Sequence, residues 1–179
     1  MSSSIPVCEN PHGLCLTANP ITLWANCYYE ADFHKALSIY IYQKIFTSGS
    51  SPFEKKNLSW AFGPNFIKTV EAFGFRHQES KIKILLRACA ETILGEATRD
   101  VHAIRKSEGG NAVQKKHGAN EANRRDIDYE FHLHYWKTAN GPIFISIVAH
   151  DDTSIAPAEN VEFTSLNKCI PHLAQEQED

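Results

Sequence analysis

The stretch DIDYEFHLHYW, residues 126–136, has the most regular pattern in this chain. Apolar side chains occupy every second position from Ile127 to Tyr135, and polar side chains lie between them. Side chains along a β-strand project alternately to its two faces, so this period of two predicts a strand with one apolar and one polar face.

The residues that follow predict a β-hairpin. Residues 138–142, TANGP, are typical of a turn, and residues 142–150 are almost entirely apolar until His150. A continuous apolar run of this length predicts a strand that is buried on both faces. A further short strand is expected at residues 161–166.

Helical spacing is clearest at residues 80–94, where apolar side chains recur every three or four positions and Gly95 follows as a stop signal. A second helix is expected at residues 33–46, with the side chain of Asp32 as its N-terminal cap.

Two earlier regions are less regular. Residues 53–73 have a helical pattern that is interrupted at Gly63-Pro64, and residues 13–29 predict short strands or irregular structure. Because helices precede strands instead of alternating with them, we expect an α+β fold with N-terminal helices packed on a small C-terminal antiparallel sheet.

The length of 179 residues suits a single domain, 1–179, with a loose leader at 1–12 and a frayed tail at 175–179. The net charge of -3 provides no overall basic field for nucleic acid. Five cysteines without a CxxC pair indicate free thiols, and therefore a cytoplasmic protein or one delivered into a target cell. No run approaches the about 20 apolar residues of a membrane span, so no membrane partner is expected.

The predicted polar strand face carries the main candidate site. His132 and His134 are two residues apart and project to one side, at roughly 6–7 Å spacing, and Glu130 and Asp128 precede them on that side. Imidazoles titrate near neutrality and carboxylates orient them, so this set suits acid–base catalysis. The plainer interpretation is that this face is simply the solvated side of a sheet.

The same residues also suit a divalent metal, either zinc or iron, bound by His132 and His134 with Asp128 or His150 as the third ligand. The HxH element is shared with cupins and other metal-binding β-barrels. The remaining cupin pattern is missing, because no Glu follows His134 at the required distance. That family is therefore not assigned.

Positive charge gathers in the polar region of residues 96–125. Arg105, Arg124 and Arg125 lie in this region, together with His102. Guanidinium groups bind phosphate through paired hydrogen bonds, which favours a substrate that carries phosphate. The alternative is that these cations form ordinary surface ion pairs with nearby carboxylates.

Three smaller features complete the set. Cys8, His12, Cys15 and Cys27 could supply four zinc ligands, although their spacing is not that of a zinc knuckle and buried thiols are the simpler reading. Gly109-Gly110-Asn111 could offer backbone N–H groups to an anion, but such runs are usually turns. Trp136 could stack on a base or cover the edge of the sheet.

These patterns predict a small metal-independent nuclease, with RNA as the favoured substrate. His132 and His134, with His102 nearby, would transfer protons, Glu130 or Asp128 would orient an imidazole, and Arg105 with Arg124 or Arg125 would stabilise the phosphorane-like transition state. The expected architecture resembles that of small bacterial ribonuclease toxins, which implies a toxin or effector role.

Two other functions stay open. One is a metal-dependent hydrolase or oxygenase that uses the HxH pair. The other is a non-enzymatic binding or immunity module whose polar face contacts a protein partner.

Overall fold

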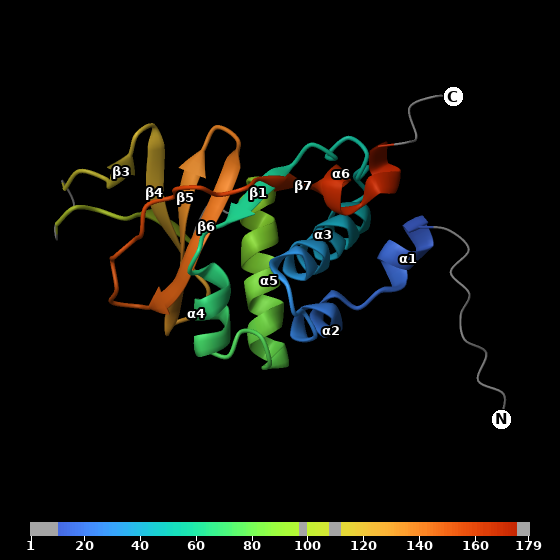
Figure 1. Cartoon of the computed structure of the whole chain (residues 1–179), viewed down its shortest axis with the longest axis horizontal. Helices are drawn as coiled ribbons and strands as arrows, with labels where there is room; N and C mark the ends of the chain where they lie inside the picture. The colour runs from blue at the N-terminus through green and yellow to red at the C-terminus, as the bar shows by residue number, and fades with distance from the viewer. Residues whose placement is uncertain (1–10, 97–99, 108–111, 175–179) are drawn as a thin grey trace.

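The computed structural model describes residues 11–96, 100–107 and 112–174, and they form a helical layer packed on one face of a mixed sheet (Figure 1). This confirms the predicted α+β class. The helices are α1 (Pro11–Thr17), α2 (Pro20–Ala25), α3 (Glu30–Thr47), α4 (Phe66–Ala72), α5 (Glu79–Leu94), α6 (Leu166–Cys169) and a 3-10 helix at Pro171–Ala174.

The strands are β1 (Ser59–Phe62), β2 (Val101–Ala103), β3 (Lys116–His117), β4 (Asn120–Asp126), β5 (Phe131–Thr138), β6 (Gly141–Ala149) and β7 (Thr164–Ser165). Their order in the sheet is β2-β4-β5-β6-β1-β7, and β3 pairs with β4. Among the described residues, no helix has both the length and the apolar character needed to cross a membrane.

Helix α5 matches its sequence prediction to within one residue. Its apolar stripe, which includes Leu85 and Leu86, is buried against the core, and Gly95 ends the helix with a left-handed φ of 73°. In α3 the carboxylate of Asp32 accepts hydrogen bonds from the backbone N–H groups of Tyr28 and Tyr29. The N-cap is Tyr29 and not Asp32 as expected, because the helix begins at Glu30 and Asp32 stands at its third position.

The expectation of strands or irregular structure at residues 13–29 is wrong, because α1 and α2 occupy this region. The side chain of Asn19 accepts from the backbone N–H groups of Ile21 and Thr22, and Pro20 stands in the first turn of α2. These capping residues set the start of a helix too short to show a clear apolar period.

The prediction of a helical region at residues 53–73 is also wrong in its first part. It contains β1, which pairs in parallel with β6, so the sheet is mixed and not purely antiparallel. Trp60 and Ala61 are fully buried there. Because this segment is buried on both faces, it forms a strand although its apolar residues have helical spacing. Residue 141 lies so close to β1 that a Cβ on Gly141 would clash with the carbonyl oxygen of Ser59.

The pattern at residues 126–136 does not form one continuous strand. Strand β4 ends at Asp126, a turn follows, and β5 begins at Phe131. Oδ1 of Asp128 accepts from the backbone N–H groups of Glu130, at 2.8 Å, and Phe131, at 2.9 Å. An aspartate that binds the backbone two and three residues ahead stabilises a tight turn, which explains the reversal.

Both faces of β5 and β6 are covered, as predicted for the apolar strand of the hairpin. Leu133 and Phe144 pack in the core beneath the helices. On the opposite face, Trp136 and Ile145 belong to a second apolar cluster, which is covered by the irregular segment 155–163. The outward face of the hairpin is thus closed by a chain segment and not by a helix.

Candidate functional site

His132 and His134 project from β5 on the sheet face opposite the helices. Both are 0% exposed, which corrects the expectation of an open polar strand face. Their neighbours across the sheet are Asp126 and Arg124 of β4 on one side and Val148 and Ser146 of β6 on the other. Side chains from both neighbouring strands and the chain after β6 close over the two rings.

The carboxylate of Asp126 contacts two imidazoles at once. Its Oδ1 lies 3.0 Å from Nε2 of His132, and its Oδ2 lies 3.5 Å from Nε2 of His102. This follows from the order β2-β4-β5, which places Asp126 between the two histidine-bearing strands. Asp126 therefore has the orienting position that the sequence assigned to Asp128 or Glu130.

His150 completes the group from the end of β6. Its ring centroid lies 4.5 Å from that of His132, and its Nδ1 lies 3.2 Å from Oδ1 of Asp151. The His102 and His150 side chains are 49% and 55% exposed, so both reach solvent while His132 does not. We call His102, Asp126, His132 and His150 the histidine–aspartate cluster.

The environment of His132 favours its neutral form. Burial lowers the pKa of this imidazole, the positive charge of Arg124 lowers it further, and the carboxylate of Asp126 raises it. A carboxylate next to a neutral imidazole fixes which ring nitrogen carries the proton. Such an imidazole can also take up a second proton when charge develops on a nearby substrate.

His134 is held apart from this cluster. Its Nδ1 lies 2.8 Å from the carbonyl oxygen of Ser154, and burial lowers its pKa to about 4. A neutral ring whose Nδ1–H donates to a backbone carbonyl ties the segment after β6 to the sheet. The predicted acid–base role of His134 therefore does not fit its surroundings, because a substrate cannot reach this ring.

The three predicted phosphate-binding arginines separate in the structure. Arg124 lies on the same face as the cluster, opposite His102 and His134 in the strand register. Arg125 points to the helices, donates to the carbonyl of Ala88 at 2.9 Å and forms an ion pair with Glu91.

Arg105 does not join the cluster either. It forms an isolated bridge with Gln114, and its guanidinium donates to the carbonyl of Ala112. Only Arg124 lies beside the cluster as predicted. Adjacent residues of a strand face opposite sides, so Arg125 faces the core. The Nε of Arg124 is buried without a hydrogen-bond partner among the described residues.

The alternative metal ligands do not assemble into one set. Asp128 is engaged in the β4–β5 turn, and the Glu130 side chain is exposed in the same turn. Within residues 11–96, 100–107 and 112–174, no group of three or more His, Cys, Asp or Glu side chains could hold a metal ion.

The N-terminal zinc hypothesis finds no support in the part of the chain that is described. Cys8 lies outside it, and Cys27 donates its thiol to the carbonyl of Leu23 at 3.3 Å. Burial raises the pKa of the Cys27 thiol to about 12, which opposes the thiolate that zinc requires. Gly109-Gly110-Asn111 also lies outside the described residues.

His117 and Trp136 meet at the other end of β5. Their ring centroids are 6.0 Å apart, and Nε1 of Trp136 donates to the carbonyl of Ala156 at 2.9 Å. Trp136 is buried, so it anchors the covering segment and is not free to stack on a base. His102 reaches the cluster, whereas His117 does not.

No protein-family model, curated protein or solved structure matches this chain. The functional argument therefore depends on the geometry of the cluster.

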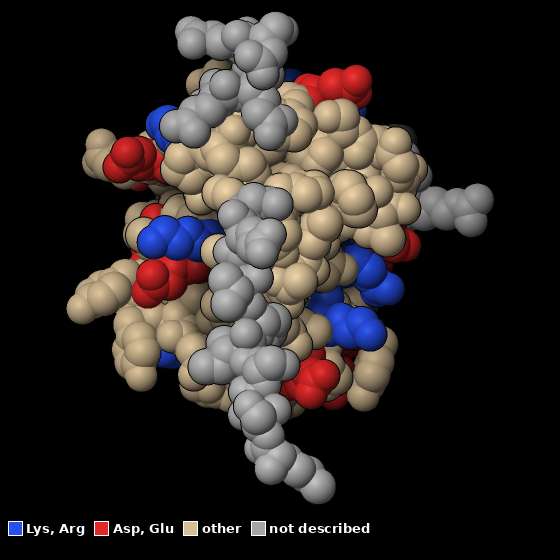
Figure 2. All heavy atoms as spheres, turned by 90° about the vertical axis from the view of Figure 1, so that its right-hand side faces the viewer, with Lys and Arg blue, Asp and Glu red and all other residues tan. Residues whose placement is uncertain are grey.

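A separate surface lies on the helical side of the molecule. Figure 2 shows a broad uncharged area there, with Lys, Arg, Asp and Glu side chains mostly around its rim. Large apolar side chains on α1–α3 are exposed, among them Leu14 and Phe46, and Tyr28 and Tyr29 are exposed just before α3. Exposed apolar groups of this kind are frequent at protein interfaces.

Sequence reasoning missed the contacts of Asp126 and gave His150 only a secondary place. Asp126 belongs to the same alternating pattern as His132, so the sequence already indicated which face of the sheet its side chain would occupy. Its true partners depend on the reversal at Asp128. The spacing of Asp128 before Glu130 and Phe131 was the available signal for that turn.

Proposed function

We propose that this chain is a metal-independent nuclease that cleaves RNA by general acid–base catalysis at the histidine–aspartate cluster. The observation that supports the proposal is the Asp126 carboxylate, which contacts His132 and the half-exposed His102 at once. Two exposed imidazoles, His102 and His150, flank the half-exposed Asp126 carboxylate and the buried His132 ring. Two such imidazoles suit the two proton transfers of the proposed reaction.

RNA cleavage needs a base and an acid. The base removes the proton of the 2′-hydroxyl, whose oxygen bonds to the adjacent phosphorus, and the acid gives a proton to the 5′-oxygen as the P–O5′ bond breaks. The products are a 2′,3′-cyclic phosphate and a 5′-hydroxyl. Because they reach solvent, His102 and His150 are assigned these two roles, in place of the buried pair His132 and His134.

The remaining groups position the catalytic imidazoles and stabilise the transition state. Asp126 orients His102, whose Nε2 lies 3.5 Å from its Oδ2. His132 supports Asp126 from the interior and packs against His150. Arg124 supplies positive charge on the same face, where it would stabilise the phosphorane-like transition state.

The test is cleavage of a mixed-sequence RNA with and without EDTA by the wild type, His102→Gln and His150→Gln, with His117→Gln as a control at the far end of β5. We expect EDTA-resistant cleavage that ends in 2′,3′-cyclic phosphate, and a loss of about 100-fold or more in the two cluster variants only. Stoichiometric zinc or iron with EDTA-sensitive cleavage would instead support a metal-dependent hydrolase.

A second candidate is a protein-binding module. The exposed apolar side chains on α1–α3 favour it, because they do not contribute to the cluster. If purified protein cleaves no RNA, and Leu14→Asp or Phe46→Asp abolishes association with a protein partner while His150→Gln does not, the binding module is the better account.

A further inference from the structure

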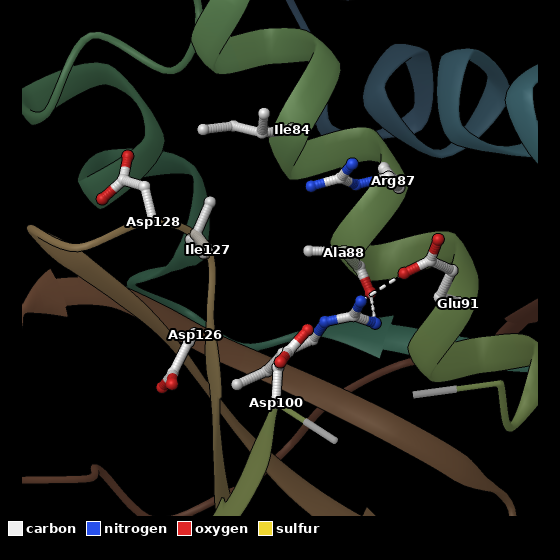
Figure 3. A pocket seen from close by; sticks show the side chains of 9 residues that line it. Ile84, Arg87, Ala88, Glu91, Asp100, Asp126, Ile127 and Asp128 are labelled. Carbon is white, nitrogen blue, oxygen red and sulfur yellow. Dashed lines mark hydrogen bonds and ion pairs between the residues drawn. The ribbon is translucent and has the colours of Figure 1, made fainter. Parts of the chain in front are cut away.

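A polar cavity of about 420 Å³ adjoins the histidine–aspartate cluster. It lies between α5 and the end of β4, and Figure 3 shows Arg87 extending from α5 into the space opposite Asp128. Asp126 lines the cavity, yet its carboxylate points away from α5, toward the side where His102 and His132 contact it. The cavity and the cluster therefore meet at Asp126.

The cavity wall offers hydrogen-bonding groups that the protein itself leaves unused. Arg87 forms no ion pair within the described part of the chain, and the carboxylate of Asp100 likewise has no hydrogen-bond or ion-pair partner there. Asp128 uses Oδ1 in the turn, which leaves Oδ2 available. Arg125, 5% exposed, also lines the cavity and keeps an unpartnered Nε among the described residues.

Apolar side chains complete the lining. Ile84 of α5 and Ile127 of the turn stand on facing sides of the cavity, and both are drawn in Figure 3. Branched aliphatic side chains pack well against a flat ring, while the charged groups can contact the edges of that ring. A planar, polar-edged molecule fits this combination better than a simple ion does.

We propose that this cavity binds a guanine base of the RNA, an inference that rests on the proposed nuclease function. Guanine presents two adjacent acceptors, O6 and N7, which match the paired donors of an Arg guanidinium such as Arg87. Its opposite edge presents the adjacent donors N1–H and N2–H, which match the two oxygens of a carboxylate such as Asp100.

The other bases fit less well. Adenine places a donor beside an acceptor on both of these edges, and uracil and cytosine lack a pair of adjacent donors. A wall with separate guanidinium and carboxylate groups thus distinguishes guanine from the rest.

The test measures the binding of guanosine and of adenosine to the whole chain by isothermal titration calorimetry. Nucleosides carry no phosphate, so any preference reports on the base alone. We expect guanosine to bind at least about tenfold more tightly than adenosine, because one paired contact provides this much discrimination. Arg87→Gln and Asp100→Asn should each remove most of that preference.

Lys83→Gln is the matched control, since Lys83 is an exposed cation on the same helix but does not line the cavity. Equal or absent binding of the two nucleosides would overturn the guanine site even if the protein cleaves RNA. A guanosine preference that survives in both Arg87→Gln and Asp100→Asn would also overturn it. Selective guanosine binding without any RNA cleavage would support the base site and reject the nuclease.

Discussion

Nε2 of His132 lies 3.0 Å from Oδ1 of Asp126, its direct neighbour across the β4–β5 pair. The two residues are six positions apart in the chain, and they meet only because the turn at Asp128 reverses the direction of the chain. Since the same carboxylate contacts His102, a change at Asp126 affects both histidines together.

Asp126→Asn should lower the pKa of His132 further below its ordinary value, because the lost carboxylate is the group that raises it. RNA cleavage should fall about 100-fold, the usual contribution of an acid–base group that is correctly oriented. NMR titration of the His132 ring and the pH–rate profile measure the two effects.

Asp128→Asn serves as the control for the His132 titration, because an amide oxygen can still accept the two backbone hydrogen bonds of the turn. An unchanged His132 pKa in Asp126→Asn would contradict the contact on which the proposed function rests.

His134 should make the protein less stable in acid. Its pKa is about 4 in the folded protein, against the ordinary value of 6.5 for an imidazole in an unfolded chain, so the unfolded state binds a proton first as the pH falls. This contribution to stability is complete above pH 6.5 and is lost on the way to pH 4, by about 3 kcal/mol.

Urea denaturation between pH 4 and 7 checks this expectation. His134→Gln should show a flatter dependence of the unfolding free energy on pH than the wild type. The exposed His117→Gln should retain the wild-type slope, and equal slopes in both variants would place the acid sensitivity elsewhere, for example at buried His34, whose pKa burial also lowers to about 4.

Arg125→Met should destabilise the fold by about 1–3 kcal/mol, because the carbonyl of Ala88 loses its donor and Glu91 keeps only Lys44 as an ion-pair partner. The double variant Arg125→Met/Glu91→Met should recover much of this loss. Urea denaturation of the single and double variants measures the coupling. A folded Arg125→Met with normal stability but weak RNA binding would restore the phosphate role that the sequence suggested.

Trp136→Phe should loosen the segment 155–163, because the indole N–H no longer donates to the carbonyl of Ala156. A hydrogen bond of this kind contributes about 1 kcal/mol. Hydrogen exchange of the backbone amides in 155–163 should accelerate. Trp24→Phe removes a comparable bond, to the carbonyl of Phe75 beneath the helices, and should leave exchange in this segment unchanged.

The parts of the fold that were predictable have a strong local period. Helix α5 and the apolar strand β6 both show their burial in the spacing of their own residues. Strand β4, in contrast, reads NEANRRD and its polar composition predicted a loop. Its polar side chains are satisfied by distant partners, such as Glu91 for Arg125 and Gln114 for Asn123, and such partners leave no trace in a local pattern.

The sequence alone determined which titratable side chains stand on β5 and on which side of the strand they lie, because side-chain direction in a strand follows from position. Tertiary structure decided which partners they contact and which of them reach solvent. The turn at Asp128 placed Asp126 between His102 and His132, and the return of the chain at Ser154 buried His134. Exposure and partner choice depend on contacts between segments far apart in the chain, and only the folded molecule brings those segments together.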